Sequence, residues 1–294
     1  MDTQQLISEL STILQDQSLL RDNNLEARKN ALDTIRYIGQ ALRVPSKDGD
    51  FQRLYHQAQA FGEQLQAIDR QLFHSVRADL QASKFTPESL HTFLNQFTDY
   101  TPDQRGQPDY EYNGLDELLE NVIFLHPLPS ESRERASGMI RYEATPARVI
   151  LELVDSLRFN PGDVFVDLGS GLGLVTMLVN LLTGVPTVGI EYDPAYCFYA
   201  QTCAAELGLS KVSFINADVR KADLSLGTIF YLFTPFINEV FDAVLEKLHR
   251  LAKQRPIYVC SYGTCTFELA QLPWLQLRDP AMEHDFKLAI FSSL

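Results

Sequence analysis

The C-terminal part of the chain alternates between short apolar runs and longer amphipathic runs, and this alternation limits the available folds more than any other feature. Expected strands cover residues 163–169, 186–191, 211–216, 227–233 and 255–263. Expected helices cover residues 173–184, 194–209 and 237–252. Strands that alternate with helices of this length join through right-handed crossovers into a mostly parallel sheet with helices on both faces. The pattern therefore predicts a doubly wound α/β fold.

The end of the chain departs from this alternation. Residues 274–279 and 285–294 have the character of strands, and only residues 280–284 separate them. A connection this short cannot make the crossover that parallel neighbours need, so the two strands are expected to pair antiparallel. The prediction is a seven-stranded sheet that is mostly parallel, with an antiparallel C-terminal edge.

The N-terminal part of the chain is helical by pattern. Apolar residues recur at three- and four-residue steps from Phe51 to Leu80, which is typical of one face of a long amphipathic helix. Residues 23–42 show a similar spacing, and Thr86 followed by Pro87 has the signature of an N-cap and a first helical position. We expect a bundle of four or five helices whose apolar stripes form its core.

Two segments rich in proline, glycine, serine and charge are expected to be loops, residues 99–114 and 126–138. The second loop joins the helical part to the α/β part, and we place the boundary near Ser132. The chain is thus expected to form an all-α domain over residues 1–131 and an α/β domain over residues 132–294.

Composition narrows the class of function. The 294 residues are 45% hydrophobic, which is enough for packed cores. A net charge of −13 argues against docking along a nucleic-acid backbone, because that affinity comes mainly from Lys and Arg. No apolar run approaches the roughly 20 residues of a membrane helix, and the N-terminus lacks the pattern of a secretory signal. The four cysteines lack the spacing of a zinc site. We expect a cytoplasmic protein with reduced thiols, no metal site and no membrane partner.

The turn between the first expected strand and its helix, DLGSGLGL, carries three alternate glycines. Glycines permit a tight turn and let backbone N–H groups approach a ligand at the carboxyl end of a strand. The fingerprint of a dinucleotide site is G-x-G-x-x-G, and Leu174 stands where its last glycine is required. Asp167 lies two residues before the first glycine, where a carboxylate suits a ligand with an ammonium group better than a pyrophosphate. A nicotinamide cofactor is therefore the weaker alternative.

This turn resembles the first motif of the class I S-adenosylmethionine-dependent methyltransferases, and the resemblance extends over roughly residues 140–294. It implies a Rossmann-like fold with S-adenosyl-L-methionine as cofactor, the turn passing along the methionine part. It also implies that Glu191 binds the ribose hydroxyls and that Asp218 and Val219 lie at the adenine. A carboxylate can accept two hydrogen bonds from a diol, so the residue type at the end of the second strand agrees. The cofactor-binding residues at the turn would be Asp167, Gly169, Ser170, Gly171 and Gly173.

The segment RYEATPAR precedes the first strand, and the resemblance implies that it closes over the methionine end of the cofactor. Tyr142, Glu143 and Thr145 would then lie at that end. The segment also resembles, in part, the non-SET histone-lysine methyltransferases, whose corresponding residues read Tyr-Gly-Glu-Thr. Here the glutamate directly follows the tyrosine, and Ala144 stands before the threonine. The residues by themselves predict a helix with Thr145 as its N-cap and Pro146 in its first turn.

Thr234, Pro235 and Phe236 follow the fourth strand, at the place of the Asn-Pro-Pro-Tyr type motif of the members that methylate amino groups. An amine acceptor there needs polar groups that orient its lone pair and an aromatic wall that excludes water. Thr234 offers a hydroxyl and a carbonyl and Phe236 a wall, but the amide is missing. In the histone-type family this strand carries paired asparagines, whereas Leu232 and Phe233 occur here. In the alternative interpretation, Pro235 only ends the strand and Phe236 belongs to the core.

The sequence as a whole predicts an S-adenosylmethionine-dependent methyltransferase. Its net charge favours a protein or a small molecule over nucleic acid as methyl acceptor, and the helical domain is expected to form one wall of the acceptor cleft. In the alternative, the chain binds S-adenosylmethionine without turning it over, as a scaffold or regulatory module. A nicotinamide-dependent oxidoreductase is the third alternative.

Overall fold

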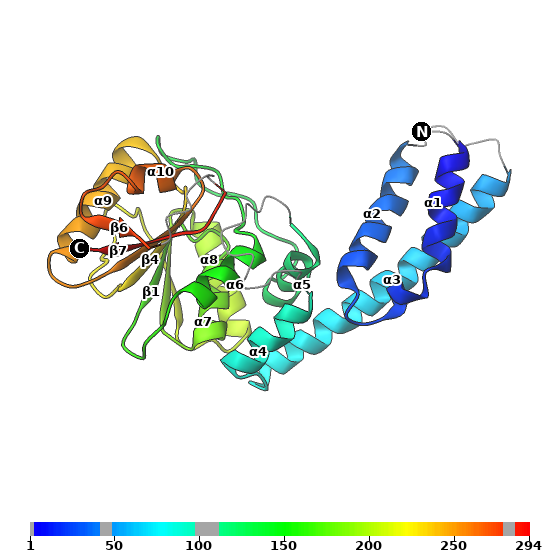
Figure 1. The fold of residues 1–294 in the computed structure, drawn as a ribbon, viewed down its shortest axis with the longest axis horizontal. Helices are drawn as coiled ribbons and strands as arrows, with labels where there is room; N and C mark the ends of the chain where they lie inside the picture. The colour runs from blue at the N-terminus through cyan, green and yellow to red at the C-terminus, as the bar shows by residue number, and fades with distance from the viewer. Residues whose placement is uncertain (1–2, 42–48, 98–111, 279–285) are drawn as a thin grey trace.

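The computed structural model describes residues 3–41, 49–97, 112–278 and 286–294. The chain has two parts, an arm of helices that carries the N-terminus and an α/β part at the other end (Figure 1). The loop expected at 126–138 is described. Most of the loop expected at 99–114, and all of residues 280–284, lie outside the described residues.

The α/β part is built on one seven-stranded sheet. Its strands are β1 (Phe165–Leu168), β2 (Thr187–Glu191), β3 (Val212–Asn216), β4 (Ile229–Phe233), β5 (Tyr258–Tyr262), β6 (Leu275–Leu277) and β7 (Ala289–Ser293). Their order in the sheet is β3-β2-β1-β4-β5-β7-β6. β1 to β5 pair in parallel, and β7 runs antiparallel to both β5 and β6. The doubly wound sheet with an antiparallel C-terminal edge is confirmed.

Helices cover both faces of this sheet. One face carries α6 (Ala147–Ser156), α7 (Leu174–Thr183) and α8 (Pro194–Glu206), and the other carries α9 (Asn238–Ala252) and the short α10 (Cys265–Leu269). Successive side chains of a strand point to opposite faces, so in β1 Phe165 joins the hydrophobic cluster under α6 to α8, while Val166 and Leu168 join the cluster under α9 and α10. Burial on both faces explains why the central strands are continuous apolar runs.

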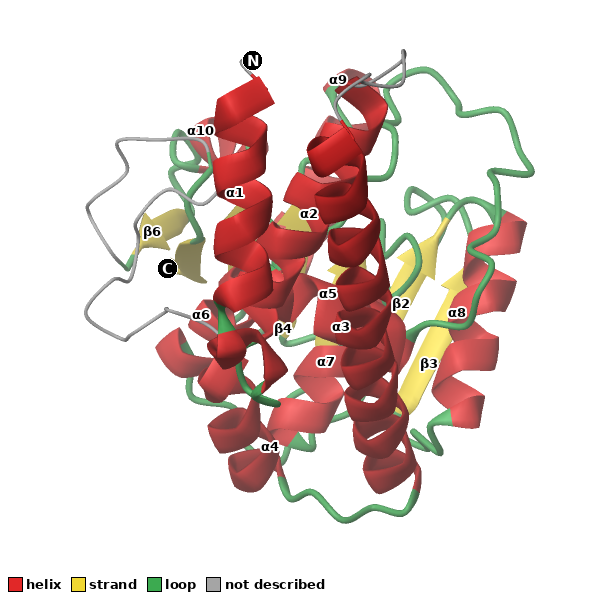
Figure 2. Ribbon diagram, turned by 90° about the vertical axis from the view of Figure 1, so that its right-hand side faces the viewer, coloured by secondary structure: helices red, strands yellow, loops and turns green. Residues whose placement is uncertain are grey.

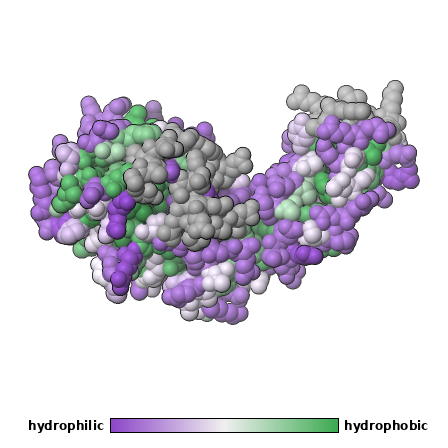
Figure 3. Space-filling view, viewed as in Figure 1, coloured by the Kyte–Doolittle hydropathy of each residue, from purple (hydrophilic) through white to green (hydrophobic). Residues whose placement is uncertain are grey.

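The arm consists of α1 (Thr3–Gln15), α2 (Leu25–Ala41) and the first half of α3 (Gly49–Gln81), with a 3-10 turn at Gln17–Leu20. Figure 2 shows these helices in front of the α/β part, and the face of the arm seen in Figure 3 is mostly hydrophilic. Apolar side chains between the helices form two small clusters around Leu10 and Leu65. The two helices predicted from apolar spacing are confirmed.

A buried ion pair joins α2 to α3. Arg28 Nε lies 2.6 Å from Asp69 Oδ1, and the two residues are 0% and 4% exposed. The other guanidinium nitrogens donate to the backbone carbonyls of Leu19, Arg21 and Asp22, which lie in and just after the 3-10 turn. Every nitrogen of the guanidinium is therefore hydrogen-bonded, as a buried charge requires.

α3 is long enough to belong to both parts. Its C-terminal half packs against α5 (Gly114–Ile123), and α4 (Pro87–Leu94), which begins after Thr86 as predicted, packs against α7. Phe73 and Leu80 of α3 lie in the same hydrophobic cluster as α6 and α7. The helical and α/β parts thus share a core on either side of Ser132, and the division into two domains there stays a prediction.

The start of α6 differs from the prediction. Thr145 is not its N-cap, because Pro146 occupies that position and makes no side-chain cap. The Thr145 hydroxyl instead lies 3.0 Å from the Tyr231 hydroxyl in the interior. The first free backbone N–H, of Ala147, donates to Asp116 of α5 over 2.7 Å. The acceptor that a local cap would supply comes here from another helix, which no local pattern can indicate.

None of the helices that the structure describes is long and apolar enough to cross a membrane. The four cysteines are free and buried. Burial raises the pKa of the Cys197 thiol to about 11, so this thiol stays protonated at neutral pH.

Candidate functional site

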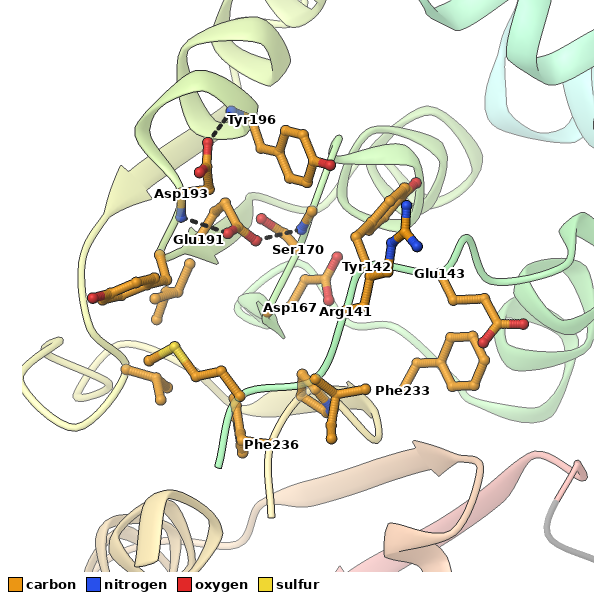
Figure 4. Close-up of a pocket in the computed structure, with 18 of the residues that line it drawn as sticks. Arg141, Tyr142, Glu143, Asp167, Ser170, Glu191, Asp193, Tyr196, Phe233 and Phe236 are labelled. Atoms are coloured by element: carbon orange, nitrogen blue, oxygen red, sulfur yellow. Dashed lines mark hydrogen bonds between the residues drawn. The ribbon is translucent and has the colours of Figure 1, made fainter. Parts of the chain in front are cut away.

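A cavity lies at the carboxyl ends of β1, β2 and β4, next to residues 131–143, which we call the strap. In Figure 4, Glu191 and Asp193 stand on one side of it and Arg141 and Tyr142 on the other, with Asp167 between them. Open α/β sheets bind ligands at this edge, where the strand order reverses between β1 and β4. The predicted site residues in its lining are Tyr142, Glu143, Thr145, Asp167, Gly169, Ser170, Gly171, Glu191, Val219, Pro235 and Phe236.

The strap is fastened at both ends. At one end, Asp193, the N-cap of α8, accepts hydrogen bonds from the backbone N–H groups of Ser132 and Arg133, each over 2.7 Å. The same carboxylate accepts from the first backbone N–H groups of α8. At the other end, Ile140 N–H donates to Pro235 O over 3.0 Å, beside a bridge between Met139 and Phe236. The strap therefore crosses from the start of α8 to the end of β4.

The glycine turn fits closely under its neighbours. Gly169 and Gly171 have φ of 87° and 53°, which favours glycine. A Cβ at position 171 would lie 2.1 Å from the ring of Tyr142, and one at position 169 would lie 2.4 Å from Pro235. The two glycines thus let the strap and the end of β4 come close to the turn. Gly173 lies outside the cavity lining, at the N-cap of α7, where a Cβ would lie 2.5 Å from Phe214.

Asp167 is the most buried acid of the cavity, with an exposure of 3%. Thr176 of α7 donates its hydroxyl to Asp167 Oδ2 over 2.9 Å. Burial, which disfavours the charged form, raises the pKa of this carboxyl to about 7, and the nearby Glu191 acts in the same direction. Among the described residues no cation offsets these effects. A cationic ligand in the cavity would supply the missing charge.

Glu191 ends β2 with both carboxylate oxygens engaged by the backbone. Oε2 accepts from Gly171 N–H and Oε1 from Asp193 N–H, each over 2.7 Å. These bonds hold the carboxylate in place and leave lone pairs for a ligand, since each oxygen can accept more than one hydrogen bond. Burial raises the pKa of Glu191. The arrangement suits a neighbouring pair of hydroxyl donors.

Asp218 follows β3, but its side chain lies outside the cavity lining. Both its oxygens accept from the Arg220 guanidinium, at 2.9 Å from Nε and 2.6 Å from Nη2. These bonds lower the pKa of Asp218. Its chain neighbours Ala217 and Val219 do line the cavity. The structure therefore brings the neighbours of Asp218, rather than its acid, to the site.

The end of β4 forms the remaining wall. Phe233, Pro235 and Phe236 line the cavity, whereas Thr234 does not. Thr234 has φ of 34°, and its hydroxyl oxygen accepts from Cys265 N–H at the start of α10 over 3.2 Å. The hydroxyl is thus turned toward the neighbouring loop, and the wall that remains is apolar.

Sequence reasoning missed several residues of this site. Asp193 was not singled out, although an aspartate followed by proline after a strand is the signature of an N-cap. Tyr192 lines the cavity with the Arg133 guanidinium 4.8 Å from its ring centroid, and Tyr196 packs edge-on against Tyr142 with ring centroids 5.7 Å apart. No local pattern pairs these residues, because the strap and α8 are far apart in sequence.

The residues that the structure describes include no group of three or more His, Cys, Asp or Glu side chains placed to hold a metal ion. Acidic side chains, the glycine turn and aromatic side chains line the cavity together, a combination that suits an organic ligand.

Residues 135–227 match the family model described as "Histone methylation protein DOT1". The match covers the second half of the strap, the glycine turn and the strands from β1 to β3. No curated protein matches the chain.

Three of the solved structures that match part of the chain are the following. An RNA methyltransferase from Salinibacter ruber in complex with S-adenosyl-L-homocysteine is 27% identical over 51% of this chain and 92% of its own, with a TM-score of 0.38. A precorrin-6y C5,15-methyltransferase from Geobacter metallireducens is 16% identical over 54% and 93%, with a TM-score of 0.39. A methyltransferase from Thiobacillus denitrificans, also with S-adenosyl-L-homocysteine, is 21% identical over 39% of this chain and 47% of its own, with a TM-score of 0.33.

Proposed function

We propose that this chain, a methyltransferase of the class I S-adenosylmethionine-dependent fold, holds its cofactor in the cavity under the strap and transfers the methyl group to a protein acceptor. The observation that carries the proposal is Asp167, a carboxylate that is 3% exposed, borders the cavity and has no cationic partner among the described residues. Such a group is costly to keep in a fold unless a ligand compensates it.

The cavity fits the parts of S-adenosylmethionine in order. Asp167 would accept from the ammonium group, and Glu191 from the two ribose hydroxyls. Val219 and Tyr192, both in the lining, would pack beside the adenine. Bound there, the sulfonium cofactor supplies the methyl group that is transferred. The assignment of each residue is part of the proposal.

The residues around the end of β4 would align the acceptor. Direct displacement needs the acceptor atom in line with the transferred methyl group and little further chemistry from side chains. Phe233, Pro235 and Phe236 form a wall that excludes water from this line. Tyr231 of β4 is fully buried, and its hydrogen bond to Thr145 connects the end of β4 to the start of α6.

A protein acceptor is supported by the description of the matching family, which concerns histone methylation, and by the net charge of −13. The arm stands beside the α/β part and offers a large surface for such an acceptor (Figure 1). Transfer of label from radioactive S-adenosylmethionine to a protein mixture tests this point. Labelling of nucleic acid or of small molecules alone would contradict it.

Binding is tested by thermal shift of the full chain. S-adenosylhomocysteine is expected to raise the melting temperature, and NAD is expected to leave it unchanged. Asp167→Asn and Glu191→Gln should each abolish most of the shift, while Asp163→Asn, at an acid near the other end of β1, serves as the matched control. Stabilisation by NAD alone would overturn the proposal in favour of an oxidoreductase. Ligand binding without label transfer to any acceptor would support a scaffold.

A further inference from the structure

We propose that Arg141 binds the carboxylate of the cofactor's amino acid, so that the cavity recognises both charges of a zwitterionic ligand. This inference rests on the proposed function, because it assigns one more residue to the S-adenosylmethionine site.

Three arginines line the cavity, and all of them lie on the strap. Two already have partners. Arg133 donates to Tyr192 O over 2.9 Å and lies over the Tyr192 ring. Arg135 donates to both carboxylate oxygens of Glu131, at 2.6 and 2.8 Å. Arg133 therefore helps to attach the strap to the end of β2, and Arg135 forms an ion pair within the strap.

Arg141 differs from both. Its side chain is exposed at the cavity, and it makes no hydrogen bond or ion pair with any residue that the structure describes. A surface arginine without a partner is common, but this one borders a site that also contains a buried, uncompensated acid. A guanidinium is suited to a carboxylate, because its planar fork can donate two parallel hydrogen bonds.

The place of Arg141 along the strap also fits. The next residue, Tyr142, lies against the glycine turn, so close that only glycine fits at position 171. The charge of Arg141 is near enough to Tyr196, which packs on Tyr142, to affect the pKa of the Tyr196 hydroxyl. Arg141 is thus held beside the turn that follows Asp167, on the opposite side of the cavity from Glu191 (Figure 4).

A ligand carboxylate in this cavity needs a positively charged partner. Five acidic residues line the cavity, namely Glu131, Glu143, Asp167, Glu191 and Asp193. A ligand carboxylate would be repelled by such a lining unless a positive charge faced it. In an amino acid the ammonium and the carboxylate share one carbon atom, so the two partners must be neighbours within the site. Arg141 is the arginine of the lining that remains free for this role.

The test compares three ligands that retain different parts of the cofactor's amino acid. S-adenosylmethionine carries both groups, decarboxylated S-adenosylmethionine keeps the ammonium, and 5′-methylthioadenosine lacks the whole amino acid. Dissociation constants would be measured by calorimetry for the wild type, Arg141→Met and Arg141→Lys. We expect Arg141→Met to weaken S-adenosylmethionine roughly tenfold and to leave the other two ligands unchanged, with Arg141→Lys in between.

Two further variants distinguish recognition of the ligand carboxylate from a general effect on the strap or on the acidic side of the cavity. Arg135→Met, on the same strap, should leave all three ligands unchanged. Asp167→Asn should weaken both ligands that carry an ammonium group. Equal weakening of all three ligands by Arg141→Met would indicate a merely structural role and overturn the inference, as would no weakening of any. Failure of the wild type to bind S-adenosylmethionine at all would instead refute the proposed function.

Discussion

The arm and the cavity each contain an aspartate that is almost completely buried, and the two are treated in opposite ways. In the arm, Asp69 is 4% exposed and is paired with Arg28. In the cavity, Asp167 is 3% exposed and, among the described residues, receives hydrogen bonds only from Thr176. Burial raises the pKa of both, but at Asp69 the guanidinium opposes the rise. The fold compensates one buried charge internally and leaves the other to be compensated by a ligand.

The largest effect is expected from removing the internal partner. Arg28→Leu leaves Asp69 buried without a counter-charge and three backbone carbonyls without their donor, so it should lower the free energy of unfolding by ~3–5 kcal/mol in urea titrations. Arg36→Leu, which breaks an exposed pair with Asp33, is the control and should cost less than ~1 kcal/mol. The double variant Arg28→Met with Asp69→Leu should recover the part of the loss that comes from the unpaired charge of Asp69, but not the part that comes from the three carbonyls. A small effect of Arg28→Leu would show that the arm does not depend on this ion pair.

At Asp167, removal of the charge is expected to stabilise the ligand-free chain rather than destabilise it. Its pKa in the folded chain, about 7, lies above the ordinary value of 3.8, so its contribution to stability is present in acid and is lost as the pH rises through 7. Asp167→Asn should therefore stabilise the ligand-free chain at pH 8, by an amount on the order of 4 kcal/mol, and change it little below about pH 4. Melting temperatures at both pH values measure this. Destabilisation at pH 8 would mean that the carboxylate is compensated within the chain after all.

A smaller effect is expected where the turn meets the strap. Gly171→Ala should destabilise the chain by ~1–3 kcal/mol and weaken S-adenosylhomocysteine roughly tenfold, because the new methyl group displaces Tyr142. Gly184→Ala is the matched control. It also has positive φ, 70°, but no atom lies within 4 Å of its added Cβ, so it should cost ~1 kcal/mol and leave binding unchanged. Equal effects on binding would show that the strap does not depend on close contact with the turn.

The smallest effect is expected at Asp218. Because Arg220 occupies both of its oxygens, Asp218→Asn should weaken S-adenosylhomocysteine by less than about threefold in calorimetry. Arg220→Met serves as the companion variant, since it frees the Asp218 carboxylate without removing it. A loss of tenfold or more in Asp218→Asn would support the direct contact with adenine that the sequence resemblance implies.

Periodicity and turn chemistry were sufficient to predict the sheet. The seven strands, their mostly parallel pairing and the antiparallel edge were predicted correctly, because each strand carries its own apolar pattern and the short connection to β7 excludes a crossover. The helix α3 was predicted for the same reason. The capping of α6 could not be predicted, since its acceptor, Asp116, comes from a different helix.

The site residues that could be predicted from the sequence are those at the carboxyl ends of strands. Asp167 and Glu191 line the cavity because they stand at the carboxyl ends of adjacent parallel strands. The orientation of a side chain is set by its partners instead, and Arg220 and Cys265 turn Asp218 and Thr234 away from the cavity. The roles of all predicted site residues stay predictions until ligand binding is measured.

The hydrogen bonds that fasten the strap also couple it to the ligand. Glu191 accepts from Asp193 N–H, and the Asp193 carboxylate accepts from Ser132 and Arg133 of the strap. Glu191, the carboxylate proposed for the ribose, is thus only two positions in the sequence from Asp193, which anchors the strap. Thermodynamic linkage requires that, if a ligand at Glu191 favours the fastened strap, the fastened strap strengthens the ligand by the same factor. Hydrogen exchange at the Ser132 and Arg133 amides would then report cofactor occupancy without any measurement of catalysis.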